Sequence, residues 1–258
     1  MTDFTRRSAA TGLGALLLPF VIGGRSAGAA AGSRQVLDYR MLVANVEIAR
    51  FQIVSRVSGN EWIVRLSIRN TGVASWLAGN ATTFMSSRIH VDGRGRAQPV
   101  RFEARYEKPD RTRETTLIYE AKGKLSAVEV RNNGKERTSD VPVDQQRGTV
   151  DPLTAYARVQ LWLGASRSVG DEIVVPVFEG RKRGDLRVRY AAGTNRGERL
   201  LLASIQGLSG FDDGDVLVSM PGESPRWLEV RVSAGAEPMV LSVVDPHAPV
   251  PTLIEPAD

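Results

Sequence analysis

The sequence predicts an all-β fold, an antiparallel meander of about thirteen strands curled into an open or spiral barrel, with one packed α-helix. Two observations support this prediction. Most of the chain alternates apolar and polar residues with a period of two, and these runs end at residue pairs that favour tight turns. With 258 residues, 42% of them hydrophobic, the chain is long enough to bury a core in one domain.

The alternation is clearest in three segments. In residues 61–69 the apolar side chains fall on one face and the charged ones on the other, and residues 100–106 and 185–190 repeat the pattern. This is the period of a half-buried strand. The same interpretation covers residues 36–43, 46–57, 84–91, 115–119, 125–130, 172–178, 199–205, 215–220, 228–232 and 239–244.

Residue pairs containing Gly lie between many of these strands. Gly and Asn adopt positive φ readily, so consecutive strands are predicted to be joined by hairpins. A sheet with one apolar and one charged face must curl or stack to bury the apolar face, which predicts the open barrel. The pairs are Gly59-Asn60, Asp92-Gly93, Lys122-Gly123, Asn133-Gly134 and Glu179-Gly180.

Residues 151–164 have helical periodicity instead. Asp151 suits the N-cap, Pro152 the first turn, and Gly164 the end of the helix. An apolar stripe within an arc of about 120° predicts that this helix lies against the sheet. The stripe consists of Leu153, Tyr156, Val159 and Leu163.

Three further segments lack strand periodicity. Residues 72–80 are expected to form a short helical turn or a loop wedge, and residues 131–150 an exposed connection into the helix. The proline-rich residues 245–258 are expected to form a flexible tail. The folded domain is therefore predicted to span residues 32–244.

Residues 1–31 have the organisation of a secretory signal peptide. Arg6 and Arg7 precede an apolar stretch over residues 13–22, and small residues with A-x-A spacing follow. The stretch is too short for a permanent membrane span, and no later segment is apolar for long enough. We therefore expect a periplasmic protein, exported by either the twin-arginine or the general secretory route.

Composition excludes several classes of function. The chain has no Cys and two His, which removes disulfides and thiol chemistry and leaves little basis for a metal site. The net charge is +5, and the basic residues are dispersed, so nucleic acid is not expected as a partner. Catalytic motifs such as G-x-S-x-G and H-E-x-x-H are missing, and no catalytic residue or cofactor is predicted.

Several short motifs together resemble one bacterial family. They are Leu37-Asp38-Tyr39, the segments 71–77 and 99–106, the segment 150–156, and Gly170-Asp171-Glu172 followed by residues 176–182. In their order and spacing, residues 35–235 are similar to the secreted envelope family known as domain of unknown function 3108. The resemblance implies a β-rich envelope protein with no assigned catalytic activity. The architecture also resembles incomplete barrels of periplasmic envelope-integrity proteins, which carry a cysteine pair that this chain lacks.

Aromatic residues outside the strands are the candidate ligand contacts. Trp76, Tyr156 and Trp162 lie in the two segments expected to border the mouth of an open barrel, where ligand sites are common. The alternative is that a helix fills the barrel and these side chains pack its core. Asp151 and Pro152 are assigned to the helix cap only.

The expected function is non-enzymatic binding of an amphipathic envelope component, lipid or glycan, in support of envelope integrity. Two alternatives remain open at this point. One is a hydrolase that acts on envelope polysaccharide or peptide through a carboxylate pair. The other is a protein-protein adaptor that uses an exposed strand edge. The sequence leaves the oligomeric state and the ligand undetermined.

Overall fold

The computed structural model describes residues 34–72, 74–75, 80–193, 197–211, 218–234 and 238–257. Within these ranges, fifteen strands form one sheet. In chain order they are β1 (Arg34–Val43), β2 (Val46–Ser58), β3 (Glu61–Asn70), β4 (Thr82–Val91), β5 (Ala97–Lys108), β6 (Arg111–Glu120), β7 (Lys124–Asn132), β8 (Lys135–Arg137), β9 (Glu172–Phe178), β10 (Arg183–Gly193), β11 (Glu198–Ser209), β12 (Val218–Ser219), β13 (Leu228–Ser233), β14 (Val240–Val244) and β15 (Thr252–Pro256).

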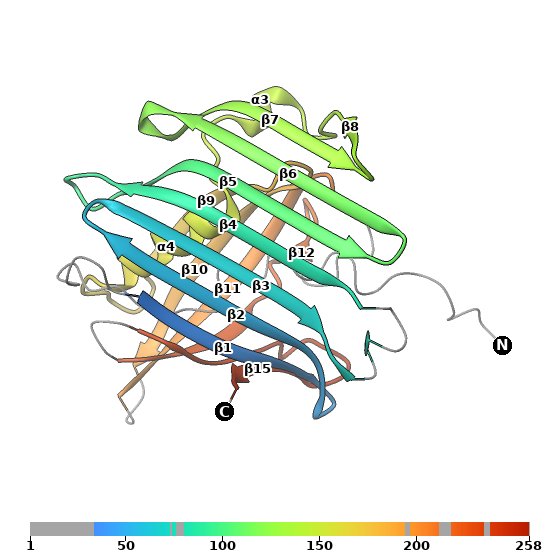
Figure 1. The fold of residues 1–258 in the computed structure, drawn as a ribbon. Coiled ribbons are helices and arrows are strands. Elements are labelled where there is room, and N and C mark those ends of the chain that lie inside the picture. The colour runs from blue at the N-terminus through green and yellow to red at the C-terminus, as the bar shows by residue number, and fades with distance from the viewer. Residues whose placement is uncertain are drawn as a thin grey trace.

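The sheet is an antiparallel meander that curls back on itself. Its order runs from β8 through β1 to β15, and then through β14, β13, β11 and β10 to β9, while β12 pairs in parallel with β11. The early strands form one layer and the later strands a second layer behind it (Figure 1). In the described part of the chain the sheet does not close, because its path ends at β8 and β9. The predicted fold class is confirmed.

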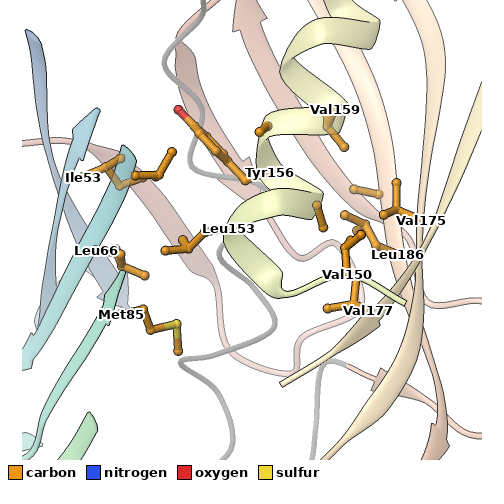
Figure 2. Close-up of a cluster of buried hydrophobic side chains, with 14 of the residues drawn as sticks. Ile53, Leu66, Met85, Val150, Leu153, Tyr156, Val159, Val175, Val177 and Leu186 are labelled. Carbon is orange, nitrogen blue, oxygen red and sulfur yellow. The ribbon is translucent and has the colours of Figure 1, made fainter. Parts of the chain in front are cut away.

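One helix, α4 (Pro152–Leu163), lies between the two layers. Its flanks pack on opposite halves of the sheet, so the helix is buried almost all round, and the predicted helix is confirmed. Figure 2 shows Leu153 and Tyr156 directed toward Ile53, Leu66 and Met85, and Val159 on the other side, toward Val175 and Leu186. Side chains of α4 therefore fill the space that an open barrel would leave for a ligand.

The C-terminal segment differs from the prediction. Residues 245–258 were expected to form a flexible tail, but β15 pairs with both β1 and β14, and Ile254 is 3% exposed. Pro249 and Pro251 precede the strand, so their missing N–H groups cost no sheet hydrogen bonds. This short strand joins the first strand to the C-terminal half of the sheet.

The connection before α4 is also more ordered than predicted. Residues 131–150 contain the end of β7, strand β8 and a short helix α3 (Val143–Gln146), with a 3-10 turn η2 (Ala121–Gly123) preceding β7. Val141 and Val150 are buried. The Val150 N–H donates to the Pro176 carbonyl, and the Phe178 N–H donates to the Val150 carbonyl, both at 2.9 Å. The connection thus covers part of the free edge of β9.

Candidate ligand-binding site

The N-terminus of α4 is fixed to the sheet through Asp151. Its carboxylate accepts hydrogen bonds from the N–H groups of Leu153 and Thr154, at 3.0 and 2.9 Å. It also accepts from the Thr154 hydroxyl at 2.6 Å and from the Ser87 hydroxyl on β4 at 3.1 Å. Burial raises the pKa of Asp151, although these hydrogen bonds oppose the shift. The predicted cap, with Pro152 in the first turn, is confirmed.

Tyr156 does not border a mouth. Its side chain is 1% exposed and lies among the core side chains (Figure 2). Its ring centroid lies 6.1 Å from that of the buried Trp62. The expectation that Tyr156 is partly exposed toward a cavity was wrong, because the curled sheet covers both flanks of the helix rather than one. Trp76, the second candidate, lies outside the described residues.

Trp162, the third candidate, lies in the last turn of α4 and is partly exposed. The guanidinium of Arg167 lies 4.9 Å from the centroid of the Trp162 ring. Arg167 Nε also donates to the Trp162 carbonyl at 2.7 Å, and Arg199 Nη1 on β11 donates to the Leu163 carbonyl at 2.8 Å. Two cationic side chains therefore converge on the C-terminus of the helix, where the helix dipole favours positive charge.

These two arginines border a pocket of about 260 Å³ at the end of α4. The loop that follows the helix is held in place by β10, since the Gly170 N–H donates to the Tyr190 carbonyl and the Tyr190 N–H donates to the Asp171 carbonyl, both at 2.8 Å. We call this site the helix-end pocket. Its lining residues are Ala165, Ser166, Arg167, Tyr190 and Arg199.

The two arginines of the helix-end pocket differ in their charge partners from a pair of arginines on β10. Within the described part of the chain, neither Arg167 nor Arg199 forms an ion pair with a carboxylate. On the outer face of the same sheet, by contrast, Arg187 and Arg189 both pair with Glu172, at 2.6 and 2.8 Å. Each guanidinium has five N–H groups and uses one on a helix carbonyl, so four remain on each for a ligand.

No sequence pattern singles out Arg167, Tyr190 or Arg199 as candidate site residues. They lie in a loop and in two different strands, and only the fold brings them to one place. Tyr190 and Arg199 also follow the ordinary strand alternation, which hides them among similar residues. The one usable signal was Trp162 at the predicted end of the helix.

The described residues were searched for a metal site and for a membrane-spanning helix. Over these ranges, no group of three or more His, Asp or Glu side chains could hold a metal ion. None of the helices in the same ranges is both long and apolar enough to cross a membrane.

One of three comparisons with known proteins places the chain in a family. A search of curated proteins gave no match. A beta-barrel-like protein from Brucella abortus, of domain of unknown function DUF1849, has a solved structure that is 11% identical in sequence, with a TM-score of 0.46 over 88% of this chain and 96% of that one. The model of a protein family of unknown function, DUF3108, matches residues 37–196, more than half of the chain. The protein therefore belongs to the DUF3108 family.

Proposed function

We propose that this protein is a non-enzymatic binding protein of the bacterial cell envelope, and that the helix-end pocket binds the anionic head group of an amphipathic lipid. The observation that carries the proposal is the pair Arg167 and Arg199, which lie at one pocket with no carboxylate partner among the described residues. Guanidinium groups bind phosphate and carboxylate through paired N–H donors. The periplasmic location rests on the signal peptide predicted over residues 1–31.

The size of the pocket favours a head group rather than a whole ligand. Its volume of about 260 Å³ lies below the ~300–1,000 Å³ typical of pockets that enclose a complete small molecule. Two apolar side chains close to Arg167 in the sequence are accessible, since Val169 in the same loop is 70% exposed and Trp162, whose ring lies 4.9 Å from the Arg167 guanidinium, is partly exposed. A head group in the pocket with its apolar part against these side chains fits a lipid better than a glycan.

The alternative functions have less support. The carboxylate of Asp151 is buried and engaged by four hydrogen bonds, so it is not available to a hydrolase. A strand-edge adaptor needs an open edge, but β8 has three residues, all exposed and charged, and Val150 covers part of β9. Short, charged edge strands oppose pairing with another chain.

The test is sedimentation of the purified protein with lipid vesicles. Vesicles that contain phosphatidylglycerol should bind the protein, and vesicles of phosphatidylcholine alone should not. Replacing Arg167 or Arg199 with Gln should weaken binding about 10- to 150-fold, since a hydrogen bond to a charged group contributes ~1.5–3 kcal/mol. Arg65→Gln is the matched control, because Arg65 is an exposed arginine on β3 outside the pocket.

Two results would contradict the proposal. One is equal binding to both kinds of vesicle. The other is a loss of affinity in Arg65→Gln as large as that in Arg199→Gln, which would indicate attraction by net charge alone. Urea unfolding of each variant shows whether a change in binding reflects a change in the folded fraction.

A further inference from the structure

A second hollow lies on the outer face of the sheet, across β4, β5, β6 and β7. It has a volume of about 330 Å³, and most of its lining side chains point away from α4, whereas Ala104 and Thr115, which also border it, face inward. We call it the outer groove. The side chains that matter for its chemistry are Phe84, Glu103, Arg105, Thr116, Glu129 and Arg131.

The register of the strands explains its shape. One cross-strand row runs from Phe84 through Arg105 and Glu114 to Arg131, and the next row runs from Glu103 through Thr116 to Glu129. Thr116 is short and stands between the longer side chains of Glu103 and Glu129, so the surface is depressed at the centre of the second row. Four neighbouring strands span about 14 Å, given a spacing of about 4.8 Å.

The charges of the outer groove nearly balance. Arg105 Nε donates to Glu107 at 2.7 Å, and Glu103 pairs with Arg101 at 2.8 Å. The carboxylate of Glu129 has no partner among the described residues. Because the groove contains both positive and negative side chains, it attracts neither anions nor cations strongly, and a highly charged polymer is a poor fit. Closely spaced acceptors and donors suit a neutral ligand with many hydroxyl groups.

Phe84 provides the apolar part of the groove. Its side chain is 46% exposed on a strand face that is otherwise polar. One exposed hydrophobic residue alone is common on protein surfaces. Here the ring stands at one end of a groove with an unpaired carboxylate, and an aromatic ring beside a few directed polar groups is the usual composition of a site for a small organic ligand.

We propose that the outer groove binds a short stretch of a neutral saccharide chain. The Phe84 ring stacks against the apolar face of one sugar ring. Glu103 and Glu129 accept hydrogen bonds from hydroxyl groups, and Arg105 and Arg131 donate to ring and hydroxyl oxygens. This site lies on the outer face of the sheet and uses none of the residues of the helix-end pocket, so either proposal can fail without the other.

The test is isothermal titration calorimetry of the purified protein with two neutral tetrasaccharides, cellotetraose and chitotetraose, and with tetragalacturonate as an acidic probe. At least one neutral tetrasaccharide should bind, and more tightly than the acidic one. Phe84→Ala should lower the affinity at least tenfold, whereas Phe84→Tyr, which keeps the ring, should retain it. Val46→Ala is the control, since Val46 is an exposed apolar residue outside the groove.

A second variant tests the groove itself rather than the aromatic ring. Thr116→Lys places a long side chain on the low centre and should abolish binding while leaving the urea midpoint unchanged, because Thr116 faces outward. No binding of either neutral tetrasaccharide would overturn the proposal. So would unchanged binding in Phe84→Ala or Thr116→Lys, or tighter binding of tetragalacturonate.

Discussion

Replacing Asp151 with Ala should destabilise the protein far more than the loss of an exposed helix cap. The change removes the acceptor for two N–H groups at the start of α4, which costs about 0.5–2 kcal/mol. It also leaves the buried hydroxyls of Ser87 and Thr154 without their acceptor, at about 1–3 kcal/mol each. The variant no longer buries a carboxylate, which offsets part of this loss. We expect a net decrease of about 2–4 kcal/mol in the free energy of unfolding.

Asp151→Asn is the matched control. The Asn side-chain oxygen can still accept from the two N–H groups, and its NH₂ group can donate to the hydroxyls once they rotate, so the loss should stay below about 1 kcal/mol. Because burial raises the pKa of Asp151 in the folded state, the native protein binds this proton more tightly than the unfolded chain. Stability that depends on Asp151 should therefore fall as the pH rises above its unfolded pKa of about 3.9, and Asp151→Asn should lack this dependence.

The measurement is urea unfolding, followed by tryptophan fluorescence at several pH values. If Asp151→Asn lost as much stability as Asp151→Ala, the carboxylate charge rather than the hydrogen bonds would hold the helix, contrary to this prediction. A loss below about 0.5 kcal/mol in Asp151→Ala would refute it equally.

Two further predictions concern buried groups. Burial raises the pKa of Glu179 to about 7, against the opposing charges of Arg181 and Lys182. The free energy of unfolding should therefore fall as the pH rises from 4.5 to 7. The fall should be at most about 3 kcal/mol, because the side chain is only half-buried and water weakens the effect. Urea unfolding of Glu179→Gln should show no such fall. Tyr156→Ala should cost about 3–5 kcal/mol in the same assay, and at matched folded fraction its vesicle binding should equal that of the wild type. Weaker vesicle binding by the folded Tyr156→Ala variant would instead indicate that Tyr156 contacts the ligand.

The sequence predicted most of the fold because the fold rests on local patterns. The period-two runs identified thirteen strands, and Asp151 and Gly164 marked the ends of the helix to within one residue. The two missed strands lack such a signal. β8 consists of three charged residues and has no apolar alternation. β15 is flanked by prolines, which are atypical of strands, although it pairs with β1 and β14. Pairing between residues more than 200 positions apart leaves no local trace.

The sites were harder to predict because they depend on how far the sheet curls. A helix with an apolar stripe can lie on an open sheet or inside a curled one, and the stripe of Leu153 and Tyr156 is compatible with both. In the curled form the second layer covers the other flank, so Tyr156 becomes core, while the last turn of the helix stays partly accessible. That end is where Arg167 and Arg199 meet, and neither stands out in the sequence.

A filled interior changes where binding can occur in this fold. An open barrel binds ligands inside, and its specificity comes from inward-facing residues. Here those residues pack against α4, so a substitution among them acts first on stability. Ligand contacts must come from outward-facing strand residues, or from the open end of the interior where Arg199 and the loop after the helix border the helix-end pocket. A substitution at Phe84 should therefore change binding with little change in stability, whereas substitutions at Leu66 or Val159 should do the reverse.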